Sequence, residues 1–81
     1  DYQVDWTEPA QEDLHAIWSH IAADNPGAAN RLREALFAQT KLLETSPRLG
    51  PMYSRHTRGE IRHLIVGNFR IFYEVFEKRH R

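Results

Sequence analysis

The side chains best suited to chemistry in this sequence are His63 and Arg70, which lie close together near its C-terminal end. An imidazole can donate or accept a proton near neutral pH, and a guanidinium pairs readily with carboxylates. We predict no metal site, because His15 and His20 are five residues apart in one predicted helix and point to different sides. The absence of cysteine excludes disulfides and thiolate metal ligands.

No motif for a bound cofactor is present. The four glycines are scattered at positions 27, 50, 59 and 67, and no serine lies in a nucleophile motif. Hydrophobic residues make up 41% of the chain and charged residues 27%, which is typical of one globular domain over residues 1–81 and argues against disorder. The apolar runs are too short to cross a membrane. We therefore expect a cytoplasmic protein without a cofactor.

A predicted β-hairpin positions the histidine and the arginine. Strands are predicted at residues 60–66 and 69–76, and glycine at the first position of the turn Gly67-Asn68 suits a type II′ geometry. With this turn, alternate residues face the core. The opposite, outer face is predicted to present Ile61, His63, Ile65, Arg70, Phe72, Glu74 and Phe76.

A strand and two helices are predicted ahead of the hairpin. Residues 2–6 alternate between apolar and polar side chains, which is typical of a half-buried strand. Apolar residues at helical spacing predict helices at about residues 8–24 and from 26 to about 45, joined through Asn25 as an antiparallel hairpin. Residues 47–57 lack periodicity and are predicted as an ordered loop. The predicted fold is α+β, in the order β-α-α-β-β, with the helical hairpin packed on one face of a small antiparallel sheet.

Three further large side chains are interpreted as structural. Arg62 faces the core side of the hairpin, so we expect its aliphatic stem to cover the core and its head to reach an acid on the first helix or at the sheet edge. Trp6 and Trp18 are predicted core anchors.

The two halves of the chain carry opposite charge. Residues 1–47 hold eight acidic and three basic side chains, whereas residues 48–81 hold three acidic and eight basic ones. Two interpretations remain open at this point. Either the basic half meets an anionic partner, such as nucleic acid or an acidic protein segment, or the two halves neutralise each other in the fold.

Three segments of the sequence resemble the RelE/ParE toxin superfamily, and its ParE-like branch of plasmid stabilisation proteins most closely. They are VDWTEPAQEDLHAIWSHIAADNPGAA at residues 4–29, LETSPRLG at 43–50 and IRHLIVGNFRIFYEV at 61–75. Phe69 stands where the family usually has tyrosine. The resemblance implies a further strand after the hairpin, and the chain stops at Arg81, where the turn into that strand would lie. We therefore expect a sheet without its last strand.

The resemblance implies a toxin of a type II toxin–antitoxin system that acts by binding, with DNA gyrase as its target. A protein antitoxin with an acidic or amphipathic segment would neutralise it, and DNA would be contacted only through that antitoxin. Target- or antitoxin-binding residues are predicted to be Phe37, Arg55, Arg58, His63, Arg70, Phe72 and Phe76. A contact between two copies of the chain, or burial under a last strand, are the alternatives for the exposed aromatic residues.

Two other functions remain open. The chain could be a ribosome-dependent mRNA endonuclease of the RelE type, with Arg70 and His63 as metal-independent catalytic residues. Arg70 could instead be structural and pair with Glu74 or Glu60. The chain could also be an inactive toxin remnant or a plain interaction module.

Overall fold

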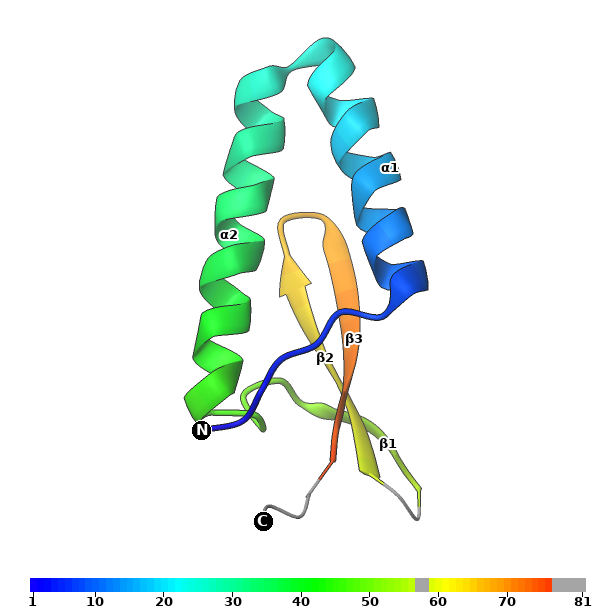
Figure 1. The fold of residues 1–81 in the computed structure, drawn as a ribbon, viewed down its shortest axis with the longest axis vertical. Coiled ribbons are helices and arrows are strands. Elements are labelled where there is room, and N and C mark those ends of the chain that lie inside the picture. Colours follow the sequence, from blue (N-terminus) through cyan, green and yellow to red (C-terminus); the bar gives the residue numbers. More distant parts are fainter. Residues whose placement is uncertain (57–58, 77–81) are drawn as a thin grey trace.

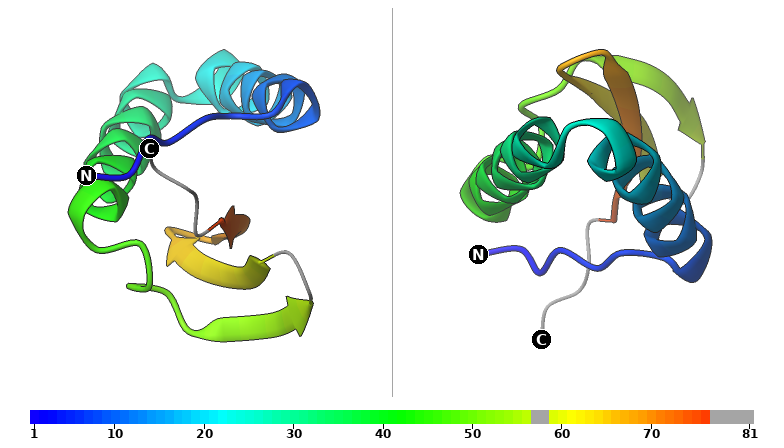
Figure 2. Two further views of the ribbon diagram at one scale, coloured as in Figure 1. Left: turned by 60° about the horizontal axis from the view of Figure 1, so that its bottom comes forward. Right: turned by 90° about the horizontal axis from the view of Figure 1, so that it is seen from above.

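The structure is a computed structural model that describes residues 1–56 and 59–76, without the side chains of Arg55 and His56. Two helices are followed by a three-stranded antiparallel sheet, which is an α+β arrangement (Figure 1). The helices and strands are α1 (Glu8–Asp24), α2 (Pro26–Thr45), β1 (Met52–His56), β2 (Gly59–Val66) and β3 (Phe69–Val75). Both helices lie on one side of the sheet, as predicted (Figure 2). Neither helix combines the length and the apolar character that a membrane span requires.

Capping residues set the ends of the two helices. The hydroxyl of Thr7 accepts a hydrogen bond of 3.2 Å from the N–H of Ala10 at the start of α1. Asn25 serves both helices: its N–H donates to the carbonyl of Ile21 at 2.8 Å, and its side-chain oxygen accepts from the N–H of Ala28 at 3.0 Å. Because one residue closes α1 and opens α2, the chain turns back at once and forms the predicted helical hairpin (Figure 1).

The hairpin of β2 and β3 has the predicted turn and register. Gly67 has a φ of +61° and no other described residue of the turn has a positive φ, as a type II′ turn requires. Val66 pairs with Phe69, and the alternating partners follow along both strands. Consequently Val66 and Val75 are buried toward the helices, whereas Ile65 and Phe72 are exposed on the other side.

The core is small and is centred on α2. Its buried side chains come from α2 and from the sheet: Ala29, Leu36, Leu43, Val66 and Val75. Among the described elements, α2 contacts both α1 and β2, whereas α1 contacts α2 alone. No residue of α1 is buried. Helix α2 therefore joins the helical hairpin to the sheet.

The strand predicted at the N-terminus is not formed. Residues 1–7 are extended but belong to no sheet, and the N–H of Tyr2 donates to the carbonyl of Glu44 near the end of α2 at 2.8 Å. The segment crosses the helical hairpin on the side away from the sheet (Figure 2). Tyr2, Val4 and Trp6 are nevertheless half-buried and the residues between them exposed. The helices shield the apolar side chains of this segment from solvent. The alternating pattern therefore arises without a neighbouring strand.

Part of the segment predicted as a loop is a strand. β1 pairs with β2 in an antiparallel manner, with an irregularity between Met52 and Ser54. Met52, Tyr53 and Ser54 are all exposed. Since none of the three side chains of β1 that the structure describes is buried, this part of the strand shows no apolar alternation, and backbone pairing to β2 holds it in the sheet.

Candidate functional site

The predicted His63 and Arg70 lie on the face of the sheet that points away from the helices. We define the outer sheet face by five side chains from the three strands: Tyr53, His63, Ile65, Arg70 and Phe72. Tyr53 is 61% exposed, Ile65 67% and Phe72 49%. Apolar side chains gathered in water in this way mark a surface suited to a partner.

Three rings of the outer sheet face form one cluster. The ring of Tyr53 stands edge-on to those of Phe72 and His63, at centroid distances of 5.0 and 6.2 Å. The rings of His63 and Phe72 are stacked, with centroids 5.9 Å apart and planes 23° from parallel. The guanidinium of Arg70 lies 5.9 Å from the centroid of Phe72. These contacts arrange the side chains before any partner arrives, which lowers the entropy cost of binding.

The other predicted binding residues are not all part of this face. Phe76 is 54% exposed and follows directly after β3. The backbone of Arg55 pairs with Glu60 in the sheet, but its side chain and the whole of Arg58 lie outside the described residues. Phe37 is 68% exposed and lies on α2, away from the sheet. The predicted set is therefore divided between different parts of the molecule.

Phe37 belongs to a second surface, the groove between the two helices. We define this interhelical groove by six of its lining residues, which come from the N-terminal segment and both helices: Trp6, Leu14, Trp18, Arg33, Leu36 and Phe37. The guanidinium of Arg33 lies 5.7 Å from the ring centroid of Trp18, and the Nε1 atom of Trp18 is buried without a hydrogen-bond partner. Trp6 and Trp18 are thus half-buried walls of a groove, and their prediction as core anchors is wrong.

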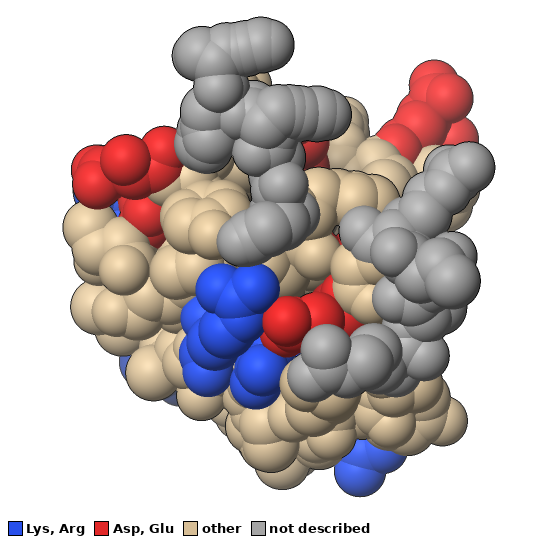
Figure 3. All heavy atoms as spheres, turned by 90° about the horizontal axis from the view of Figure 1, so that it is seen from below, with Lys and Arg blue, Asp and Glu red and all other residues tan. Residues whose placement is uncertain are grey.

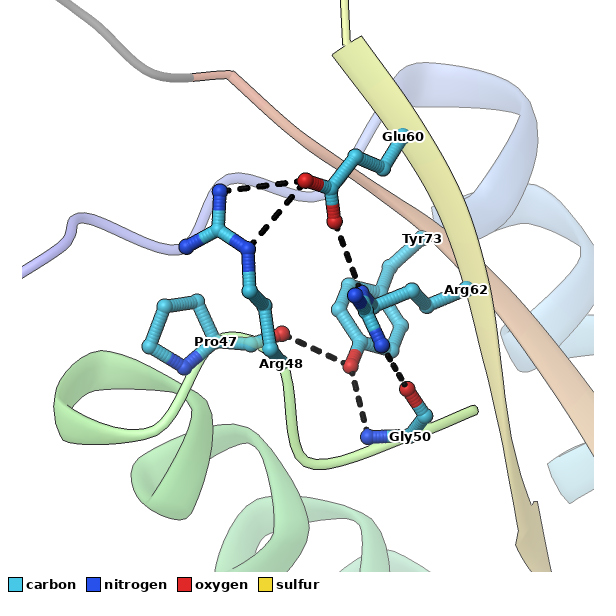
Figure 4. Close-up of polar contacts among 6 residues, drawn as sticks. All are labelled: Pro47, Arg48, Gly50, Glu60, Arg62 and Tyr73. Carbon is cyan, nitrogen blue, oxygen red and sulfur yellow. Dashed lines mark hydrogen bonds and ion pairs between the residues drawn. The ribbon is translucent and has the colours of Figure 1, made fainter. Parts of the chain in front are cut away.

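A network of hydrogen bonds fastens the loop between α2 and β1 to the sheet (Figure 4). The hydroxyl of Tyr73 donates to the carbonyl of Pro47 at 2.8 Å and accepts from the N–H of Gly50 at 2.9 Å. Arg62 Nη1 donates to the carbonyl of Gly50 at 2.8 Å. The loop approaches β2 so closely that a Cβ atom at Gly50 would collide with the carbonyl oxygen of His63. Only glycine fits at this position.

The carboxylate of Glu60 completes the network. It accepts from Nε of Arg62 at 2.9 Å and pairs with Nη2 of Arg48 at 3.1 Å. The hydrogen bond from Arg62, followed by that from Arg48, holds the pKa of Glu60 below its ordinary value of 4.5. Arg62 therefore reaches an acid on its own strand, and the prediction of an acid on the first helix or the sheet edge is wrong. Viewed from below, acidic and basic atoms lie side by side at this end of the molecule (Figure 3).

The ion pairs of this network also test two hypotheses: that Arg70 pairs with an acid, and that the two oppositely charged halves of the chain neutralise each other. Glu60 pairs with Arg48 and Arg62, so it is not the partner of Arg70. Among the described residues, Arg70 forms no ion pair. The pairs of Glu60 join charges within the basic half of the sequence, as Lys41 and Glu44 do within the acidic half. These pairs do not provide the neutralisation between halves that one of the two interpretations supposed.

One member of the outer sheet face escaped sequence reasoning. Tyr53 lies in the segment predicted as a loop, yet its ring contacts both His63 and Phe72. Tyrosine has a high strand propensity, and this was the only local indication of a strand at Tyr53. The nearby Pro47, Gly50 and Pro51 are typical of a loop and favoured the loop prediction.

A comparison with protein families gives a match over nearly the whole chain. The family model described as ParE toxin of type II toxin-antitoxin system, parDE, matches residues 4–81. No curated protein and no solved structure gives a significant match. The matched region contains both helices, all three strands and both surfaces described above. The chain therefore belongs to the family of ParE toxins of type II toxin–antitoxin systems, for which a protein antitoxin is the implied partner.

Proposed function

We propose that this toxin acts by binding a protein target, that the target is DNA gyrase, and that an antitoxin segment seated on the toxin neutralises it. The observation that carries the proposal is the outer sheet face. The rings of Tyr53 and Phe72 are exposed, contacts with each other and with His63 order them, and the guanidinium of Arg70 accompanies them. Aromatic residues and arginine are the side chains that most often dominate the binding energy of protein interfaces. Gyrase is named because of the resemblance to ParE-like toxins.

The interhelical groove supports the part of the proposal that concerns the antitoxin. Its walls are two helices, and its lining combines large apolar side chains with the guanidinium of Arg33. An amphipathic helix binds in such a groove by laying its apolar side against the walls. A carboxylate on that helix would find Arg33 at the wall of α2. An acidic, amphipathic antitoxin segment therefore fits this surface.

Supercoiling by purified gyrase tests the proposed target. The chain is incubated with gyrase and relaxed plasmid, and the products are separated on agarose gels. We expect loss of supercoiling or accumulation of cleaved DNA as the toxin concentration rises, while relaxation by a type I topoisomerase continues. Unchanged supercoiling at a large excess of folded toxin would contradict the assignment of gyrase.

The endonuclease alternative is favoured by one observation, the presence of His63 and Arg70 on the same exposed face of the sheet. The Nδ1 atom of His63 is buried without a hydrogen-bond partner, so a proton would be exchanged at Nε2. A translation extract separates this function from gyrase binding. Codon-specific cuts in mRNA that disappear in Arg70→Ala would support the endonuclease, and intact mRNA at saturating toxin would exclude it.

A further inference from the structure

The residues predicted from the sequence as one binding set lie on two separate surfaces. His63, Arg70 and Phe72 belong to the outer sheet face, which points away from the helices. Phe37 lines the interhelical groove, to which no described residue of the sheet contributes. The helices lie on one side of the sheet (Figure 2), and the exposed Ile65 and Phe72 alternate with the buried Val66 and Val75 along β2 and β3. One small ligand cannot contact both surfaces, so each has a role to be assigned separately.

The outer sheet face has a shape and a chemistry suited to the surface of a folded protein. Its side chains stand on paired strands, so their spacing is set by the sheet register. Tyr53, Ile65 and Phe72 offer apolar contact, and no walls enclose them as the two helices enclose the groove. Broad faces with an aromatic centre are typical of interfaces between folded proteins.

The charge on this face identifies what the partner must present. Arg70 is exposed, its guanidinium lies 5.9 Å from the ring centroid of Phe72, and it forms no ion pair with any residue that the structure describes. The N–H groups of this guanidinium are therefore left to donate to a partner. A carboxylate is the group that accepts two of these hydrogen bonds side by side.

We infer that the outer sheet face is the surface that contacts the toxin's target, and that the target presents an Asp or Glu carboxylate to Arg70 within an apolar patch that covers Ile65 and Phe72. This inference rests on the proposed function, because it assigns one of the two surfaces to the target and leaves the groove to the antitoxin. The two partners then share no toxin residue.

Separate surfaces are compatible with neutralisation because the toxin is narrow. Its two shorter dimensions are 22 and 21 Å, which is about the width of two packed helices. An antitoxin that extends beyond the groove on either side overhangs the toxin and excludes a large target by its bulk.

Two matched pairs of variants test the assignment. Arg70→Glu on the outer sheet face is compared with Arg33→Glu in the groove, since each arginine is exposed and lies close to a ring centroid, at 5.9 and 5.7 Å. Phe72→Ala is compared with Phe37→Ala. The full chain is expressed from a repressible promoter in bacteria without antitoxin, and growth arrest is measured alongside inhibition of gyrase by the purified proteins. Circular dichroism and thermal melting confirm that each variant is folded.

We expect Arg70→Glu and Phe72→Ala to raise the toxin concentration needed for half-inhibition by about tenfold or more. Arg70→Lys keeps the charge but loses the paired donors, so its effect should be intermediate. Arg33→Glu and Phe37→Ala should each lower inhibition and growth arrest less than their counterpart on the outer sheet face, because the groove is assigned to the antitoxin and not to the target.

The outcomes separate this inference from the proposed function. Equal or larger losses in the two groove variants, or folded face variants as active as the unmodified toxin, would overturn the assignment of the outer sheet face. Growth arrest without gyrase inhibition would remove gyrase as the target, while the order of the four variants in growth arrest would still decide the inference. If the unmodified chain causes neither growth arrest nor gyrase inhibition, the inference is overturned as well. Cutting of mRNA that depends on Arg70 would also overturn it.

Discussion

The loop between α2 and β1 and the helix α1 are attached to the rest of the molecule in very different ways. Side-chain hydrogen bonds from Tyr73 and Arg62 hold the loop to the sheet at Pro47 and Gly50. Helix α1 contacts α2 alone among the described elements, and none of its residues is buried. The sheet that carries the outer sheet face is therefore the firmly held region, and one wall of the groove is the weakly held one.

The largest effect should come from Gly50→Ala, which attacks the firmly held region directly. The added Cβ would collide with the backbone carbonyl of His63, and a backbone atom cannot turn aside as a side chain can. We expect unfolding in urea to show a loss of about 3 kcal/mol or more, at the upper end of the range for overpacked sites. Gly27→Ala is the matched control, because Gly27 is exposed near the start of α2 and a Cβ there meets only ordinary contacts. A Gly50→Ala protein as stable as the control would contradict the close approach.

A pair of leucine truncations compares the two regions. Leu36 on α2 is a core residue that is 5% exposed, so Leu36→Ala should cost about 3 kcal/mol in the free energy of unfolding. Leu14 on α1 is half-buried at the groove, so Leu14→Ala should cost only about 1 kcal/mol, since less apolar area returns to water. Equal losses in urea unfolding would show that α1 is held as firmly as the core.

Removal of a single hydroxyl tests the hydrogen bonds of the loop. Tyr73→Phe deletes the group that joins Pro47 to Gly50, and we expect it to cost about 2 kcal/mol because two partly buried backbone groups lose their partner. Tyr53→Phe removes a hydroxyl from an exposed ring and should change stability by less than about 0.5 kcal/mol. The same urea assay measures both variants, and similar effects would contradict the role given to the network.

The smallest effect should be a dependence of stability on pH through Glu60. Its pKa is lowered in the folded protein, so its contribution is present above the ordinary value of 4.5 and is lost as the pH falls through the folded pKa. Glu60→Gln cannot titrate, so the difference in melting temperature between the unmodified chain and the variant should shrink on acidification from neutral pH to about pH 3. A difference that stays constant over that range would show that the two arginines do not stabilise the carboxylate.

The helix starts and the hairpin turn depend on residues a few positions apart, and the sequence predicts them correctly. Thr7 and Asn25 predict the starts of the helices because each cap bonds to a residue three positions away. Gly67 predicts the register of the hairpin because glycine suits the first position of a type II′ turn, where φ is positive. This turn has two residues, so its position fixes which residues of the two strands pair. The composition of the outer sheet face follows from that register, and His63, Arg70 and Phe72 were assigned to it correctly.

Features that depend on distant contacts were not predictable in the same way. Trp6 lines the groove between the two helices, and its burial depends on the distance between them. The alternation of residues 2–6 contains no information about that distance. β1 depends on pairing with β2, and the bond between Tyr73 and Pro47 joins residues 26 positions apart. The separation of Phe37 from Phe72 likewise follows from the packing of the two layers. Such relationships require the fold before they can be stated.

The Gly67-Asn68 turn also restricts how this chain can change during evolution. If the turn kept two residues, adding one residue between Val66 and Phe69 would shift every later residue of β3 to the opposite side of the sheet. A guanidinium would then be forced beneath the helices, and the phenol that anchors the loop would be left in solvent. An insertion at this tip therefore has to be absorbed by a longer loop, whereas substitutions on the exposed side of the strands leave the register unchanged and can alter which partners bind there.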